Sequence, residues 1–113
     1  MSRETTEGGT TPFDVVLEQR GADLWVCPQG DLDLSGAPEF SEALSLARRS
    51  DAESIIVDLR DLEFLDSTGL GVLVRACSSP DGARIQLIEG PPAVMQVLRV
   101  SGLDRELPLR PAP

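Results

Sequence analysis

The sequence predicts an α/β fold: a mixed β-sheet with helices mainly on one face. Three observations support this prediction. Short alternating apolar stretches, typical of half-buried strands, are interleaved with segments of helical periodicity. The resulting order is β-β-α-β-α-β-α, and strand–helix–strand succession implies parallel neighbours with right-handed crossovers. Alternation within the strands indicates one open sheet face, since strands covered on both faces are continuously apolar.

The first two strands are predicted to form a hairpin. The stretch FDVVLEQ, residues 13–19, places Phe13, Val15 and Leu17 on one side. The residues RGAD then supply turn chemistry, and LWVCPQGDL, residues 24–32, resumes an extended apolar pattern. Pro28 interrupts this second strand, so we expect a bulge or a position without a ladder hydrogen bond there.

The first helix is predicted to begin at Ser35. Its apolar residues fall on one helical stripe, namely Ala37, Phe40, Ala43, Leu44 and Ala47. Ser35 is the expected N-cap, and Pro38 suits the first turn because a helix start does not need its missing N–H.

The remaining chain alternates strands and helices. Strands are predicted at residues 54–59 and 83–90, with a short further strand near 106–109. Helices are predicted at residues 67–79 and 91–102, the second closing at Gly102. The polar residues 1–12 are expected to be a disordered tail, residues 13–109 a single domain, and residues 110–113 a C-terminal tail.

Composition excludes several kinds of chemistry. The 113 residues contain no histidine, no tyrosine and no lysine. Without histidine the commonest general base and the Ser-His-Asp triad are missing. Without lysine there is no phosphate-binding P-loop lysine. Cys27 and Cys77 are interpreted as small buried residues, without disulfide or metal-ligand spacing. We therefore expect a protein that is not an enzyme and has no cofactor or bound metal.

Charge and hydropathy indicate where the protein acts. The net charge of −9 disfavours contact with nucleic acid or an anionic membrane. No apolar run is long enough to span a bilayer, and the N-terminal residues lack the apolar core of a signal peptide. A cytoplasmic protein is the simplest interpretation.

Polar residues follow two of the predicted strands at the same sheet edge. The loop after residue 32 and the loop after residue 59 both lead into helices, and parallel strands present such loops on one side. We expect this edge to gather Asp31, Asp33, Asp66, Ser67 and Thr68. Gly69 and Gly71 follow, although each glycine inside a helix costs about 1 kcal/mol relative to alanine.

Two explanations of this edge remain open. In the first, Asp66 is a plain N-cap and the glycines permit close packing of helix and strand. In the second, bare backbone lets another protein approach Ser67, whose phosphorylation would add about −1.5 to −2 charges. The helix dipole would tolerate that charge, whereas a docked protein surface would not.

Three motifs resemble those of one known family. The stretches IIVDLRDLEFLDSTGLGVLVRA, GDLDLSGAPEF and RVSGLDRELPL resemble the STAS domain and, within it, bacterial anti-sigma factor antagonists. The resemblance implies a STAS-like fold and partner switching. An unphosphorylated antagonist binds an anti-sigma factor, which is also a serine kinase, and thereby releases a sigma factor. By this resemblance, Ser67 is the phosphorylated serine. A metal-dependent serine phosphatase then reverses the modification.

The resemblance also implies a partner-binding surface. Asp33 matches the aspartate of the first motif, and Asp66, Thr68 and Gly69 match neighbours of the serine. The main alternative is a STAS scaffold module in a stress-signalling or lipid-transport complex, without a serine switch. A metal-dependent enzyme using Asp31, Asp33 and Asp66 is a weaker alternative, since short loops without His or Lys leave little acid–base machinery. A nucleotide site at STGLGVLV is weaker still, because the phosphate-binding lysine is missing.

Overall fold

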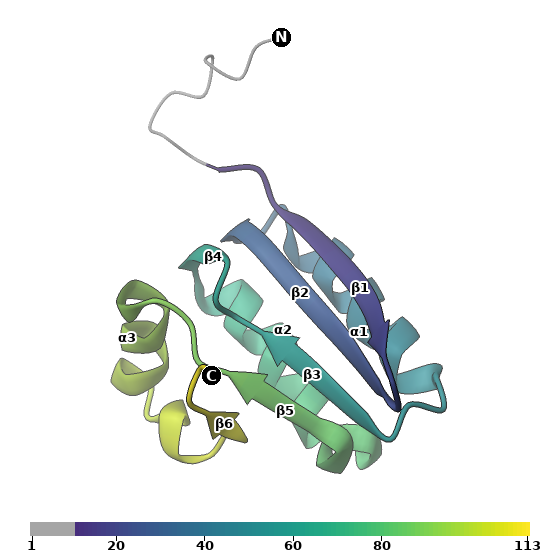
Figure 1. The fold of residues 1–113 in the computed structure, drawn as a ribbon. Helices are drawn as coiled ribbons and strands as arrows, with labels where there is room; N and C mark the ends of the chain where they lie inside the picture. Colours follow the sequence, from purple (N-terminus) through teal and green to yellow (C-terminus); the bar gives the residue numbers. More distant parts are fainter. Residues whose placement is uncertain (1–10) are drawn as a thin grey trace, which may run out of the picture.

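A computed structural model describes residues 11–113, so most of the predicted N-terminal tail lies outside the described range. Within that range the chain forms a mixed sheet with helices packed against it, as predicted (Figure 1). The strands are β1 (Asp14–Arg20), β2 (Asp23–Leu32), β3 (Ser54–Asp58), β4 (Leu62–Leu65), β5 (Ile85–Ile88) and β6 (Leu109–Arg110). The α-helices are α1 (Ala37–Arg49), α2 (Ser67–Ser78) and α3 (Pro92–Val100), with 3-10 turns at Pro80–Arg84 and Leu103–Arg105.

The sheet order is β1-β2-β3-β5-β6, and β4 also pairs with β2. The β1–β2 hairpin is antiparallel, and the other pairings are parallel. Strand β4 was not predicted, because its four residues were assigned to the loop before α2. It extends the sheet beyond the end of β3 and places Leu65 beside Leu32.

Pro28 lies where β2 changes partners. Strand β2 pairs with β3 through residues 23–26 and with β4 through residues 30–32, so Pro28 falls between the two stretches. The pairing of Pro28 with Val15 of β1 continues without interruption, so of the two expectations for Pro28 the bulge is wrong and the position without a ladder hydrogen bond on one side fits. The irregularity occurs instead between Gly30 and Asp31, opposite β4. The missing N–H of Pro28 is therefore tolerated because β2 has no second partner there.

Helices α1 and α2 lie side by side on one face of the sheet, which confirms the one-sided prediction (Figure 1). The core between them and the strands is aliphatic, with one fully buried aromatic ring, Phe40. Its large members with almost no exposed surface include Leu32, Leu44, Ile55, Leu73 and Leu87. The helix α3 packs against β4 at the edge of the sheet. Gly102 ends this helix in a left-handed conformation, with φ 76°, as predicted.

The C-terminal strand is displaced from its predicted place. We expected a strand at residues 106–109, but a 3-10 turn occupies residues 103–105 and β6 spans Leu109–Arg110. Arg110 was assigned to a tail by sequence, yet its carbonyl accepts a hydrogen bond from the backbone of Glu89. Pairing with β5 extends the sheet by this short edge strand.

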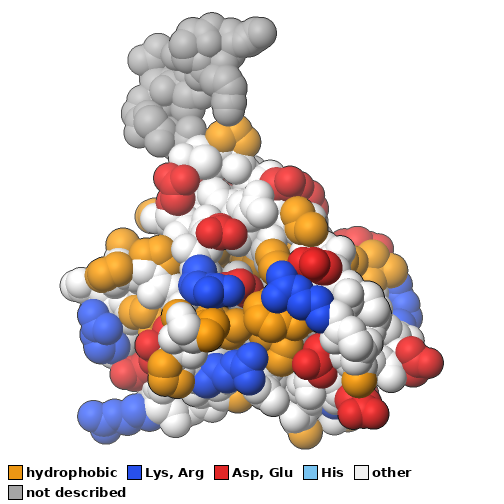
Figure 2. Space-filling view, viewed as in Figure 1, with side chains coloured by type: hydrophobic (Ala, Val, Ile, Leu, Met, Phe, Trp, Pro, Cys, Tyr) orange, Lys and Arg blue, Asp and Glu red, His pale blue; other side chains and the backbone are white. Residues whose placement is uncertain are grey.

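The opposite sheet face carries arginines instead of helices. The Arg20 guanidinium lies 3.9 Å from the centre of the Trp25 ring, a cation–π contact. Arg60 binds the buried carboxylate of Asp58, and Arg110 donates to Gln86. Figure 2, seen from the same side, shows basic side chains bordering apolar ones over the strands. This face is therefore closed by long side chains whose stems cover apolar surface.

Both cysteines are free, and they are only partly buried where burial was predicted. Burial raises the pKa of the Cys77 thiol to about 11, so it stays protonated at neutral pH. In residues 11–113 no helix combines the length and apolarity that crossing a membrane requires.

Candidate functional site

The ends of β2 and β4 bring the two predicted loops together. Leu32 pairs with Leu65, so the residues that follow each of them leave the sheet side by side. The backbone N–H of Asp66 donates to the carbonyl of Leu32 at 3.2 Å, which ties the second loop to the first. The sheet edge anticipated from topology is therefore formed, and it carries Asp31, Asp33, Asp66, Ser67 and Thr68.

Asp33 organises the start of α1. Its Oδ1 accepts hydrogen bonds from the Ser35 backbone at 3.0 Å, the Ser35 hydroxyl at 2.8 Å and the Gly36 backbone at 3.3 Å. The Ser35 hydroxyl, followed by these backbone donors, holds the pKa of Asp33 below its ordinary value. Ser35 was predicted as the N-cap, and this is wrong: the N-cap is Gly36, which makes no side-chain cap bond. The Asp33 carboxylate, three residues before Gly36, instead holds the turn that leads into α1.

Asp66 is the N-cap of α2, as predicted. Its Oδ1 accepts from the backbone N–H groups of Thr68 at 2.9 Å and Gly69 at 3.0 Å. These bonds satisfy two of the donors that every helix start leaves without an intrahelical partner. The cap is complete without the side chain of Ser67.

Ser67 is exposed and stands at the mouth of an apolar groove. Its hydroxyl forms no hydrogen bond with any other residue in the range 11–113. The groove has a volume of about 350 Å³ and runs between α2 and α3. Its walls are Leu70 on one side and Val97 and Val100 on the other, and Val100 is 79% exposed. A reacting group at Ser67 thus has open access from solvent and an apolar surface beside it.

The two glycines of α2 have different surroundings. Gly69 is buried, and a Cβ there would lie 2.6 Å from Cγ of Leu32 and 3.0 Å from its carbonyl oxygen. Gly69 therefore allows close packing of α2 on β2, in line with the first of the two explanations left open. A Cβ on Gly71 would approach only Nη1 of Arg75, at 3.2 Å. Gly71 is partly buried and is bordered only by this flexible side chain, so close packing accounts for Gly69 but not for Gly71.

Asp31 holds the segment that precedes β1. Its Oδ2 accepts from the Thr11 backbone at 3.0 Å, and its own N–H donates to the Thr11 carbonyl at 3.1 Å. The Thr11 hydroxyl donates to Glu63 of β4. Gly30, with φ 83°, permits this crossing, because a Cβ there would lie 2.2 Å from the Pro12 carbonyl oxygen. Among the predicted site residues, Asp31 is thus engaged within the chain.

Sequence reasoning missed the apolar part of this edge. Leu34, directly after Asp33, is 73% exposed, and Phe64, three residues before Ser67, is 48% exposed. The groove wall from α3 was also missed, because only the folded chain brings Val97 and Val100 beside Ser67. The available signal in the sequence was that Leu34 and Val100 stand at the ends of apolar patterns, where a large apolar side chain can be exposed. Exposed apolar side chains such as Val100, which borders the groove, are typical of interaction surfaces where they form a patch.

The carboxylates of this edge are not arranged as a metal centre. No group of three His, Cys, Asp or Glu side chains with metal-binding proximity occurs in residues 11–113. Asp33 and Asp66 each direct one carboxylate oxygen at backbone N–H groups of a helix start. The geometry supports capping, not three carboxylates converging on one cation.

Comparison with known proteins identifies relatives. The family model described as "Mlab, STAS domain" matches residues 15–111. The anti-sigma-B factor antagonist of Listeria monocytogenes is 38% identical over 68 residues, 59% of this chain and 60% of the relative. The anti-sigma-B factor antagonist of Staphylococcus aureus is 40% identical over 45 residues, 40% of this chain and 42% of the relative. The chain thus spans about three fifths or less of the length of the curated relatives it matches.

Solved structures share the fold. An anti-sigma factor antagonist from Mycobacterium paratuberculosis superposes with a TM-score of 0.79 at 23% identity, over 87% of this chain and 85% of that chain. The anti-sigma factor antagonist SpoIIAA in its unphosphorylated form gives 0.72 at 23% identity, over 88% and 89%. A chain of the Acinetobacter MlaFEDB complex gives 0.64 at 24% identity, over 85% and 100%. With a family model matched over most of its length, this chain belongs to the STAS domain family.

Proposed function

We propose that this STAS protein is an anti-sigma factor antagonist controlled by phosphorylation of Ser67. In its unphosphorylated form it binds an anti-sigma factor that is also a serine kinase, and a sigma factor is released. The kinase, using its own ATP, then phosphorylates Ser67, and the complex separates. A metal-dependent serine phosphatase restores the binding form. The protein itself acts in the cytoplasm as a regulator, without catalysis or cofactor.

One observation carries the proposal: the exposed Ser67 hydroxyl is free of bonds within residues 11–113 and borders an apolar groove. The fold can accept a phosphate there, because Asp66 completes the helix cap and the α2 dipole favours negative charge at its start. A partner protein docked over the groove cannot accommodate a phosphate on Ser67 as easily. Covering the groove would strip water from a group carrying about −1.5 to −2 charges, which is costly without a cationic partner.

The proposed partner-binding surface surrounds Ser67. Asp33 and Thr68 lie on the same edge, and the exposed side chains of Leu34, Phe64 and Val100 supply apolar contact area. Asp31, Asp66 and Gly69 support this surface from within: Asp31 anchors residue 11, Asp66 caps α2, and Gly69 seats α2 on β2. The relatives named anti-sigma-B factor antagonists support the choice of an anti-sigma factor as partner.

A direct experiment is phosphorylation by the anti-sigma factor that co-purifies with this protein. We expect incubation with ATP and Mg²⁺ to add one phosphate to the intact mass, and Ser67→Ala to abolish the addition. Ser35→Ala and Thr68→Ala are the matched controls and should still accept the phosphate. Phosphate retained on Ser67→Ala, or no transfer to the wild type, would contradict the proposal.

The alternative role as a scaffold module without a switch is favoured by one observation, the similarity to a chain of the MlaFEDB complex. The two roles differ in their response to charge at Ser67. A scaffold partner would bind the wild type and Ser67→Asp equally, whereas the switch requires that Ser67→Asp loses its partner.

A further inference from the structure

A second polar cleft lies between α1 and α2, outside the Ser67 edge. It has a volume of about 240 Å³ and is lined by arginines and serines: Arg48, Arg75, Ser41, Ser45 and Ser79. The rest of its lining is apolar, and no aspartate or glutamate is among the lining residues. The chain carries a net charge of −9, yet the charged residues that line this cleft are both positive.

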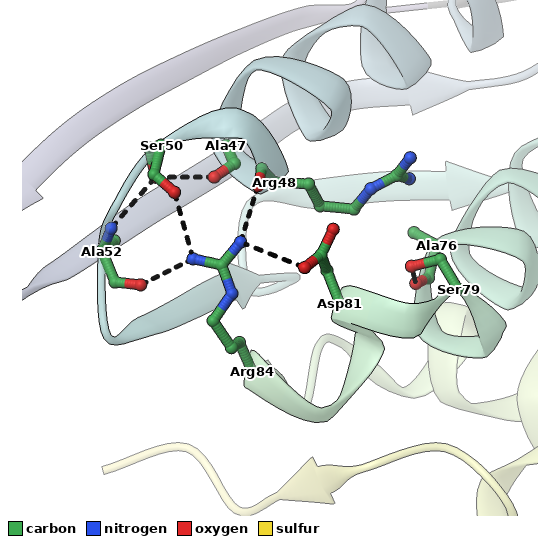
Figure 3. Close-up of polar contacts among 8 residues, drawn as sticks. All are labelled: Ala47, Arg48, Ser50, Ala52, Ala76, Ser79, Asp81 and Arg84. Carbon is green, nitrogen blue, oxygen red and sulfur yellow. Dashed lines mark hydrogen bonds and ion pairs between the residues drawn. The ribbon is translucent and has the colours of Figure 1, made fainter.

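Arg48 forms no ion pair with any residue in the range 11–113. Its Nε is fully buried and has no hydrogen-bond partner among residues 11–113. In Figure 3 no hydrogen bond or ion pair joins the Arg48 side chain to the other residues drawn, while Arg84 donates to the Arg48 carbonyl at 2.6 Å and the Ala52 carbonyl at 2.6 Å. The nearby carboxylate of Asp81 forms its ion pair with Arg84. A buried donor without an acceptor in the fold is costly, and a bound ligand or an ordered water satisfies it.

Arg75 contributes the second cation from α2. It forms no ion pair with a described residue, and its Nη1 lies beside Gly71, one turn earlier in the helix. Alanine at position 71 would narrow this space, since its Cβ would lie 3.2 Å from Nη1. The glycine thus leaves room for the guanidinium to fold back along α2. Two guanidinium groups on adjacent helices therefore border one cleft.

We propose that this cleft binds a small oxyanion of the phosphate class, held by Arg48 and Arg75. Planar guanidinium groups bind phosphate oxygens through paired charge-assisted hydrogen bonds, and serine hydroxyls add neutral donors. Ser41 and Ser45 have no hydrogen-bond partner for their hydroxyls within residues 11–113. The cleft is smaller than the roughly 300 Å³ at which drug-sized sites begin, so the ligand is inorganic phosphate or a short phosphoester. The site does not depend on the proposed switch, because it contains neither Ser67 nor the apolar groove.

Calorimetric titration of the purified protein with sodium phosphate tests the proposal, in a low-salt buffer and with sodium chloride as reference. We expect saturable binding of one phosphate per chain. Arg48→Gln and Arg75→Gln should each weaken it at least about ten-fold, as expected for loss of a charge-assisted pair. Arg49→Gln is the matched control: it removes the same charge from the neighbouring, exposed position of α1 and should change affinity less than about two-fold.

A second titration with glycerol 3-phosphate separates the two sources of the anion. Tighter binding of the ester supports a phosphoester ligand, and equal or weaker binding supports free phosphate. Absence of saturable binding by either compound, or an equal loss in all three variants, would overturn the proposal. Circular dichroism of each variant controls for folding. If Arg48→Gln does not fold, the phosphate affinity of Arg75→Gln still tests the proposal, because Arg75 is exposed.

Discussion

The starts of α1 and α2 use the same device with different results. In both, an aspartate carboxylate accepts hydrogen bonds from two backbone N–H groups. The donors to Asp33 are Ser35 and Gly36, just before α1, and the donors to Asp66 are Thr68 and Gly69, in the first turn of α2. The serine that follows differs. Ser35 donates its hydroxyl to Asp33 at 2.8 Å, whereas the Ser67 hydroxyl has no bond within residues 11–113. The Ser35 hydroxyl is therefore occupied within the chain, whereas the Ser67 hydroxyl is available for the proposed modification.

The starts of α1 and α2 also differ in the residues that surround them. The α2 start borders the groove formed with α3, whereas the α1 start lies under the ring of Phe13. Each start also contains a glycine in close contact, Gly69 against Leu32 and Gly36 against Phe13. The following changes test how far the two starts differ, and they are ordered by the expected change in the free energy of unfolding.

Gly69→Ala should give the largest loss of stability. Its Cβ would meet the fully buried side chain and the carbonyl of Leu32, which cannot move without shifting β2. Overpacking of this kind costs about 1–3 kcal/mol. Gly36→Ala is the matched variant and should cost less, because the Phe13 ring that its Cβ would meet, at 2.8 Å, is only partly buried. Urea unfolding measures both, and a larger loss for Gly36→Ala would contradict the comparison.

Asp66→Ala should lower stability by about 1 kcal/mol, the usual cost of losing an N-cap side chain. It would leave the N–H groups of Thr68 and Gly69 without their acceptor. Asp66→Asn is the control and should retain most of the stability, since asparagine caps about as well as aspartate. If both variants were equally destabilised, the charge of Asp66 and not its cap would be the important feature.

Gly71→Ala should raise stability by about 0.5–1 kcal/mol. Alanine is favoured over glycine within a helix, and the only close atom is the flexible end of Arg75. Opposite signs for Gly69→Ala and Gly71→Ala would show that only the first of these glycines is required for packing. A loss of stability in Gly71→Ala, seen as a lower thermal midpoint, would contradict this.

The smallest effect concerns the pH dependence of the α1 start. The pKa of Asp33 is lowered from 3.8, mainly by the Ser35 hydroxyl, so its contribution to stability is present above the unfolded-state pKa. That contribution is lost as pH falls through the lowered folded-state pKa. NMR titration of the Asp33 carboxyl should give a midpoint below 3.8, and Ser35→Ala should raise it. If Ser35→Ala left the titration midpoint of Asp33 unchanged, the hydrogen bond that distinguishes Ser35 from Ser67 would be contradicted.

Sequence patterns predicted the parts of this fold that depend on local periodicity. The stripe of α1, the Asp66 cap and the closure of α3 at Gly102 follow from residue spacing and backbone preference. Strand β4 could not be separated from a loop, because LEFL is short and its partner β2 is 30 residues distant. The predicted cap at Ser35 was wrong because the Ser35 hydroxyl donates to Asp33 within the turn before the helix, and α1 begins only at Ala37, after Gly36.

Features made by contact between distant segments could not be predicted. The sheet edge followed from topology, but the groove beside Ser67 needs α2 and α3 to pack together. The arginine cleft likewise needs α1 beside α2, and neither Arg48 nor Arg75 stands in a recognisable motif. The exposure of individual residues at the start of α2 could not be predicted either, since Gly69 is buried while Ser67, two residues earlier, is exposed.

The affinity of the anti-sigma factor for Ser67→Asp and Ser67→Asn tests the central claim most directly. The two side chains have nearly the same shape, so their difference isolates charge. Ser78→Asp, at the exposed far end of α2 and roughly 16 Å along the helix, controls for net charge. We predict that Ser67→Asp binds about 100-fold more weakly than the wild type, or about 2.8 kcal/mol, with Ser67→Asn and Ser78→Asp within about ten-fold. Equal affinities of wild type and Ser67→Asp would contradict the account.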